Sequence, residues 1–207
     1  MANEALPVSI LTMSMQNDGT TIYYPQVIGL KDGTVQQSIN KAIHHEVQKL
    51  IQFQYEGQYT DTFEEMIGTF EIKTNERHVL SLTLTNYAFA PEHANGLTLI
   101  KGLTFDTTTG ELYALSDLFK KGSDYVEVLS RHVKEQIKAR DIPLIVDFKQ
   151  IDPEQDYYIA DKSLVIFFQT IEIAPHSMGS PMFPISVFAL EDIVTEDGPL
   201  GRMATND

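Results

Sequence analysis

The feature that most constrains the fold is a change in hydrophobic periodicity along the first half of the chain. Between residues 35 and 51, apolar residues recur at spacings of three and four: Val35, Ile39, Ala42, Ile43, Val47, Leu50 and Ile51. This spacing predicts an amphipathic helix with one apolar face. Residues 80–85 instead alternate between apolar and polar side chains, which is typical of an antiparallel strand with one buried face. Together the two patterns predict a sheet with one face covered by a helix.

Further strands are predicted around this helix. Residues 8–15 and 20–24 alternate loosely and flank an Asn-Asp-Gly turn, which predicts an N-terminal hairpin. Strands are also expected at residues 69–74, 79–89 and 97–106, and Gly110 is expected to take a positive φ in the turn that follows. The first half of the chain therefore predicts several strands and one helix.

The second half repeats this order of elements. Tyr125, Leu129, Val133 and Ile137 are spaced by four residues, which predicts a second helix over about residues 123–140 that ends before Pro143. Strands are expected at residues 157–159, 163–168 and 183–188. The predicted fold class is α+β with two subdomains, residues 1–95 and 96–194, each an antiparallel-rich sheet packed against one main helix. Residues 195–207 hold little apolar material and are expected to form a flexible tail.

Charge and composition exclude several kinds of function. The chain has 29 acidic and 15 basic residues, a net charge of −14 that repels phosphate backbones, so no nucleic-acid partner is expected. The acidity either serves binding or only keeps the protein in solution. The absence of cysteine excludes disulfides and thiolate metal sites. No signal peptide is predicted at the N-terminus and no stretch approaches the roughly 20 apolar residues of a membrane helix, so the chain taken alone is expected in the cytoplasm.

Sequence motifs of catalysis are absent. The chain has no Gly-x-Ser-x-Gly elbow, no phosphate loop and no dinucleotide fingerprint, and no cofactor is expected. Asp106 is interpreted as the strand-end residue that opens a turn. One metal hypothesis stays open: His93 and His176 lie in predicted loops, and with Glu92 or Glu172 they would offer a set of ligands.

The most distinctive stretch is the loop within residues 167–185. It carries three prolines and a glycine, which make a stiff connection, and it includes Met178 and Met182. A stiff loop loses little conformational entropy on binding, so this one is interpreted either as a preorganised contact surface or as a broad turn that caps the sheet.

The same stretch carries a family resemblance. Glu172-Ile-Ala-Pro-His-Ser-Met-Gly-Ser-Pro-Met-Phe-Pro-Ile185 resembles the C-terminal signature of the domain shared by RsiV-type anti-sigma factors and PdaC-type peptidoglycan deacetylases. The Asp-Leu-Phe turn at residues 117–119 and the Tyr-Pro pair at residues 24–25 are also similar to that family. The resemblance covers about residues 8–192. It implies a PdaC-like subdomain over residues 1–95 and an RsiV-like subdomain over residues 96–194.

The resemblance also implies a kind of function. Such domains are generally displayed outside the bacterial membrane, in the cell envelope, and in RsiV the domain is a receptor that binds lysozyme. A net charge of −14 suits a basic ligand of this kind. The family often has a histidine where this chain has Asn95, and the resemblance extends to no sigma-binding segment and no deacetylase domain. It therefore implies the shared module alone.

The sequence thus predicts a non-enzymatic, acidic, protein-binding module whose partner is a basic protein such as a lysozyme-like cell-wall hydrolase. The residues expected to bind the ligand come from two loops, and no catalytic or metal site is assigned. They are Glu172, Pro175, His176, Met178, Met182, Glu92, His93 and Asn95. Two alternatives remain: a cell-wall glycan-binding accessory module that uses Tyr87 and Phe89 as exposed stacking platforms, and a small metal-dependent hydrolase that uses His93 or His176.

Overall fold

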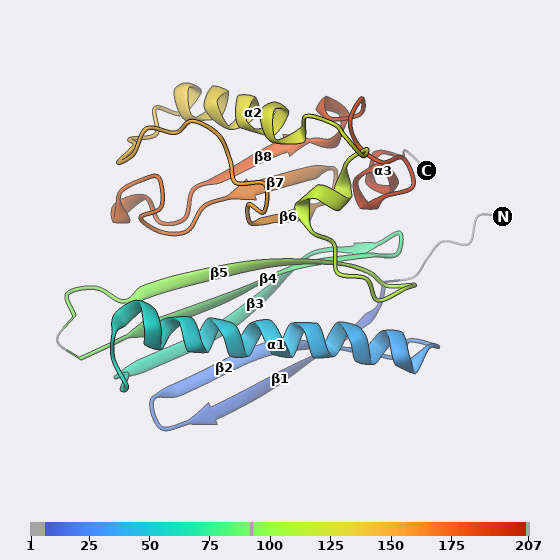
Figure 1. The fold of residues 1–207 in the computed structure, drawn as a ribbon. Coiled ribbons are helices and arrows are strands. Elements are labelled where there is room, and N and C mark those ends of the chain that lie inside the picture. Colours follow the sequence, from blue (N-terminus) through green and yellow to red (C-terminus); the bar gives the residue numbers. More distant parts are fainter. Residues whose placement is uncertain (1–6, 92, 206–207) are drawn as a thin grey trace. The chain divides into compact units, whose positions relative to one another are not determined.

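The chain divides into two compact units in the computed structural model, which describes residues 7–91 and 93–205 (Figure 1). Unit 1 is Met1–Leu112 and unit 2 is Tyr113–Asp207. The boundary was expected after residue 95. It lies later because strand β5 (Leu97–Asp106) pairs with strand β4 (Val79–Phe89) from Ala88 and Leu97 to Val79 and Asp106, and therefore belongs to unit 1.

Unit 1 contains a five-stranded sheet in the order β1-β2-β3-β4-β5 (Figure 1). The predicted N-terminal hairpin is present as antiparallel strands β1 (Ser9–Asn17) and β2 (Thr20–Ile28). Strand β3 (Glu65–Glu76) pairs antiparallel with β4. Strands β2 and β3 are parallel and pair over three residues only, Thr20 to Ile22 with Met66 to Gly68. The sheet is thus two antiparallel pieces joined at one short parallel contact.

Helix α1 (Gly33–Gln58) connects β2 to β3 and lies against one face of the unit 1 sheet (Figure 1). It begins after Asp32, whose carboxylate accepts hydrogen bonds from the backbone N–H groups of Thr34 and Val35 at 2.8 and 3.3 Å. The predicted apolar face is confirmed, because it packs into one core with the strands. That core includes Ile39, Ile43, Val47 and Leu50 of the helix and Ile22, Met66, Leu80, Leu82 and Leu84 of the sheet.

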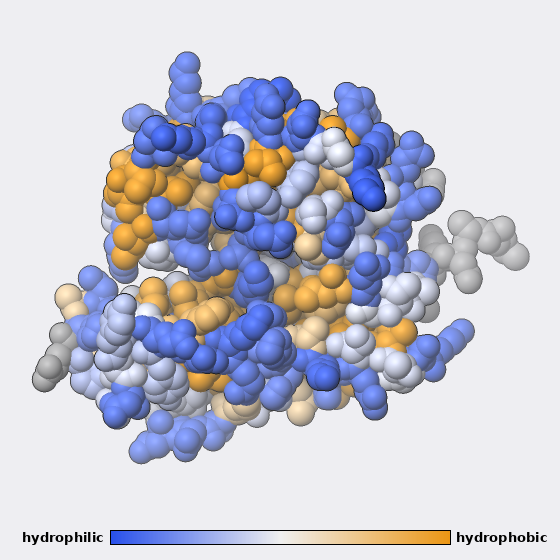
Figure 2. Space-filling view, viewed as in Figure 1, coloured by the Kyte–Doolittle hydropathy of each residue, from blue (hydrophilic) through white to orange (hydrophobic). Residues whose placement is uncertain are grey.

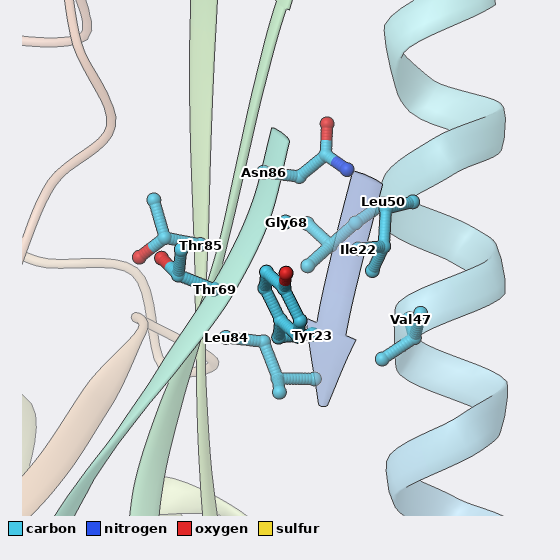
Figure 3. A pocket seen from close by; sticks show the side chains of 9 residues that line it. All are labelled: Ile22, Tyr23, Val47, Leu50, Gly68, Thr69, Leu84, Thr85 and Asn86. Atoms are coloured by element: carbon cyan, nitrogen blue, oxygen red, sulfur yellow. The ribbon is translucent and has the colours of Figure 1, made fainter. Parts of the chain in front are cut away.

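The parallel contact between β2 and β3 depends on a glycine. Gly68 lies directly opposite Ile22, and a Cβ atom at Gly68 would lie 2.4 Å from Ile22 Cγ2. Figure 3 shows the two residues side by side at the edge of a small cavity. Only a residue without a side chain lets the strands approach this closely.

Unit 2 pairs helix α2 (Tyr125–Ala139) with a three-stranded antiparallel sheet (Figure 1). Its strands are β6 (Tyr157–Ala160), β7 (Ser163–Phe167) and β8 (Met182–Ser186). The last turn of α2 is fastened to β8, because Gln136 and Arg140 donate hydrogen bonds to the backbone carbonyls of Pro184 and Met182 at 2.9 and 2.7 Å. Both units combine helices with mostly antiparallel sheets, so the predicted α+β class is confirmed.

Short helices complete the chain. Three 3₁₀ helices are η1 (Leu115–Leu118), η2 (His176–Met178) and η3 (Val187–Ala189). The segment expected to be a flexible tail instead contains helix α3 (Pro199–Ala204), whose Leu200 and Met203 are buried. These two apolar side chains are three residues apart and share one helix face, which sequence reasoning overlooked. Over the described ranges 7–91 and 93–205, the structure contains no helix that is both long and apolar enough to cross a membrane.

Candidate functional site

The residues predicted to bind a ligand fall in two different units. His93 and Asn95 are exposed in the loop between β4 and β5 of unit 1, and Glu92 lies outside the described residues. Glu172, Pro175, His176, Met178 and Met182 all belong to unit 2, in the β7–β8 loop and the first residue of β8. Neither unit by itself contains the combined surface, which stays a prediction.

Within unit 2, the β7–β8 loop is held by its own hydrogen bonds. Gln169 N–H donates to the Glu172 carboxylate at 2.6 Å, and Glu172 N–H donates back to the Gln169 carbonyl at 3.1 Å. Residues 176–178 form η2, in which His176 and Met178 are exposed, and Pro175 before it is half-buried. Met182 is half-buried, and the Tyr158 hydroxyl donates to its sulfur at 3.4 Å. The predicted loop is therefore an ordered surface feature.

A second segment of unit 2 contributes apolar side chains that sequence reasoning missed. Leu144, Ile145 and Val146 follow α2 and are exposed. Their backbone is nevertheless fixed, because Ile145 N–H donates to the Ile173 carbonyl at 3.0 Å in the β7–β8 loop. The only sequence signal was an apolar run, Leu-Ile-Val, directly after Pro143 and outside any helix.

Aromatic packing anchors this segment to the sheet. The ring of Phe148 meets the ring of Phe168 edge-on at 5.7 Å, and Phe168 meets Phe183 of β8 in the same way at 5.7 Å. Arg140 lies over the other end of this row, 5.4 Å from the centre of the Phe183 ring. The buried row holds residues 144–146 in place while their own side chains face outward.

Ile171, in the β7–β8 loop, is a further exposed aliphatic residue of unit 2 and has an unusual backbone. It is 51% exposed, and its φ is +68°, a conformation that a β-branched residue rarely adopts. We call Leu144, Ile145 and Val146 the aliphatic patch. Figure 2 shows apolar residues gathered at the end of unit 2 where the loop after α2 and the β7–β8 loop lie. Backbone strain of this kind is found preferentially at functional sites.

A groove of ≈ 440 Å³ lies beside the aliphatic patch and shares Val146 with it. Its walls combine apolar side chains with three carboxylates, those of Asp147, Asp152 and Glu172, and one lysine, Lys149. The cavity of unit 1 in Figure 3 is far smaller, ≈ 10 Å³, about the volume that one water needs. The unit 2 groove is therefore the better candidate for contact with a ligand.

Negatively charged side chains outnumber positively charged ones around the groove. Burial of its carboxyl group raises the pKa of Glu172 above the ordinary 4.5, although much of the residue is exposed, and the nearby Asp156 and Asp152 raise it further. The hydrogen bonds from Gln169 and Gln155 oppose these effects in part. The pKa of Tyr125 is likewise raised, first by burial and then by Glu154 and Asp152. A cation placed here would relieve this repulsion.

The structure also bears on the two alternative functions, the metal-dependent hydrolase and the glycan-binding module. Across residues 7–91 and 93–205, no three His, Asp or Glu side chains are grouped so as to hold a metal ion. Asp106 opens a turn as predicted, because its carboxylate accepts from the N–H groups of Thr108 and Thr109 at 2.7 and 3.0 Å. Tyr87 and Phe89 are half-buried rather than exposed. The Tyr87 ring also lies so close to Gly96 that a Cβ there would be 2.3 Å from it, which covers part of the predicted stacking platform.

Comparison with known proteins gives similarity to one family over part of the chain and to one curated relative over most of it. Residues 116–187 match the model of the family described as "Protein of unknown function (DUF3298)". The chain is 28% identical over 184 residues to the anti-sigma-V factor RsiV of Bacillus subtilis (strain 168), an alignment that covers 82% of this chain and 63% of that protein. The chain thus spans less than two thirds of the length of this curated relative.

Solved structures share the fold across nearly the whole chain. A DUF3298 family member from Bacteroides fragilis NCTC 9343 is similar with a TM-score of 0.67 and 12% identity, covering 99% of this chain and 98% of that one. A DUF3298 family protein from Pseudomonas aeruginosa PAO1 has a TM-score of 0.68 and 15% identity, covering 93% and 96%. The predicted RsiV-like domain is confirmed by these comparisons together.

Proposed function

We propose, from the premise that this chain contains an RsiV-like domain, that it recognises a basic protein through unit 2. The relationship to an anti-sigma factor indicates a binding or regulatory module. The finer proposal is that the module is non-enzymatic and that its partner is a lysozyme-like cell-wall hydrolase. The aliphatic patch would form the centre of the contact, and the acidic groove would lie at its side.

The observation that carries this proposal is the ordered exposure of the aliphatic patch. Interfaces have an apolar centre surrounded by polar groups, and a backbone that is already fixed loses little further entropy when a partner covers its side chains. Here the backbone of Ile145 is bonded to Ile173, and the Phe148–Phe168 contact anchors the segment. The patch is therefore preorganised for contact.

Charge supports a basic partner. Between residues 144 and 176, six acidic residues accompany only two lysines. Because the pKa of Glu172 is raised by burial and by neighbouring aspartates, a lysine or arginine of the partner would find a carboxylate whose ionisation it favours. Such complementarity speeds the encounter and weakens as salt screens it.

The proposal can be tested by titration of the protein with hen lysozyme at low and high salt. Two variants would be compared, each of which replaces a partly exposed apolar residue by serine. Ile145→Ser changes the patch, where Ile145 is 48% exposed, and Phe188→Ser is the control, where Phe188 is 46% exposed. Phe188 follows Ser186 and so lies beyond the opposite end of β8 from Met182. The two changes remove similar apolar surface from different places on unit 2.

We expect salt-sensitive binding that Ile145→Ser weakens by about tenfold, the effect of roughly 1.4 kcal/mol of lost contact at an interface. Phe188→Ser should leave the affinity within about a factor of two of the unsubstituted protein, as for residues outside an interface core. Absence of binding at both salt concentrations would refute the lysozyme-like partner. Equal weakening by the two variants would refute the patch as the contact surface.

A further inference from the structure

Strand β1 leaves one edge of the unit 1 sheet open. It pairs along all nine residues with β2, and it is the outermost strand in the order of that sheet (Figure 1). Within residues 7–91 and 93–205, no other strand pairs with its outer edge. Such an edge offers a row of backbone N–H and C=O groups to another strand.

Strand β1 lacks the residues that usually protect an open edge strand from pairing with another chain. Proteins generally place lysine, proline or a bulge on exposed edge strands, because these features discourage pairing with another chain. The nine residues Ser9–Asn17 contain no charged residue and no proline, in a chain of which 21% is charged. The pairing of β1 with β2 also runs from Ser9 to Asn17 in an unbroken register, so no bulge turns the edge away.

We propose that β1 pairs with β1 of a second copy of this chain, antiparallel and centred on Met13. In this register Met13 lies opposite Met13 of the second copy. The same register places Leu11 opposite Met15 and Thr12 opposite Ser14, so two apolar side chains meet in the first pair and two hydroxyls in the second, while Ile10 lies opposite Gln16. Matched cross-strand pairs of this kind stabilise antiparallel sheets.

Exposure and charge favour a second copy as the occupant. Leu11 is 48% exposed, and the symmetric pairing would cover it with Met15 of the second copy. Two molecules of net charge −14 repel each other, so contact between them is least unfavourable at an uncharged surface, which β1 provides. Because each copy uses the same edge, the pairing closes at two copies. This inference is independent of the ligand proposed for unit 2.

The first test measures mass in solution by sedimentation equilibrium over a range of protein concentrations. We expect a dimer of about twice 23.3 kDa that becomes more populated as salt screens the net charge. Met13→Lys would place two cations opposite each other and should give a monomer. The control Ile72→Lys introduces the same charge at an exposed residue of the interior strand β3, and should leave the dimer intact.

The second test uses the absence of cysteine from the chain. Opposite residues of an antiparallel pair have Cα atoms about 4.5–5.5 Å apart, which a disulfide can span. Under mild oxidation, Met13→Cys should therefore cross-link to itself. Ser9→Cys alone should not, whereas a mixture of Ser9→Cys and Asn17→Cys should form the mixed disulfide.

Three outcomes would overturn the proposal: an unsubstituted protein that stays monomeric at every concentration, a protein that assembles beyond two copies, or Ser9→Cys that cross-links as readily as Met13→Cys. If Met13→Lys prevents folding, as circular dichroism would show, the cysteine variants decide the question by themselves.

Discussion

The positive φ of Ile171 leads to a prediction that separates backbone strain from side-chain contact. With φ at +68°, the Cβ atom of any residue other than glycine crowds the backbone, which costs about 1–2 kcal/mol. Ile171→Ala keeps the Cβ atom, and Ile171→Gly removes it. Both variants remove the rest of the side chain, so the loss of apolar contacts is nearly the same in the two.

The difference in unfolding free energy between these two variants therefore measures the cost of the positive φ at position 171. In ordinary helix or strand conformation, glycine is less stable than alanine by about 0.5–1 kcal/mol, because it loses more freedom on folding. At position 171 the order should reverse: the relief of about 1–2 kcal/mol outweighs this entropy, and glycine should be more stable than alanine by about 0.5–1 kcal/mol.

Urea denaturation followed by circular dichroism would measure this difference as a shift in the midpoint. Met178 provides the control, because it is also exposed in the β7–β8 loop but has no positive φ. There, Met178→Gly should be less stable than Met178→Ala. Equal stability of the two variants at position 171, or greater stability of alanine, would refute the strained backbone at Ile171.

Other substitutions test other parts of the structure. Because the folded state raises the pKa of Glu172, its contribution to stability is full below pH 4.5 and is lost as pH rises through the folded pKa. Glu172→Gln should therefore raise the thermal midpoint at pH 7, and this gain should shrink toward pH 4.5, as calorimetry would show. Gly68→Ala forces a Cβ atom against Ile22 and should destabilise unit 1 by about 1–3 kcal/mol in urea denaturation. Leu200→Ala should destabilise unit 2 by about 2–5 kcal/mol, because Leu200 is fully buried, whereas an unordered tail would show no change.

Sequence periodicity predicted the elements whose apolar side chains gather on one face. The spacing from Val35 to Ile51 located α1, because it reflects burial of one helix face. The alternation at residues 80–85 located β4, but the prediction of a single buried face was wrong, because Ser81 and Thr83 are buried as well. The pairing of β2 with β3 was not predictable in this way. It involves three residue pairs far apart in sequence and depends on the close approach of Gly68 to Ile22.

The candidate site was predictable only in part, for a similar reason. Glu172 and Met178 were predicted because they belong to a proline-rich loop with a recognisable signature, and their role in binding stays a prediction. Leu144, Ile145 and Val146 resemble core residues in composition, and their exposure follows from the anchoring of Phe148 and from one backbone hydrogen bond to Ile173. The positive φ of Ile171 comes from the turn around it and has no counterpart in the residue type.

The short contact between β2 and β3 also bears on how unit 1 folds. Strands β1 and β2 form one local hairpin, and β3, β4 and β5 form a second local piece, so both can form early with little loss of chain entropy. Residues 23–65 must fold back on themselves before Thr20 to Ile22 reach Met66 to Gly68. Such long-range closure is the slow step in most sheets. The joining of the two pieces at Gly68 should therefore set the folding rate of unit 1, and its opening should be the first event when the unit is pulled apart.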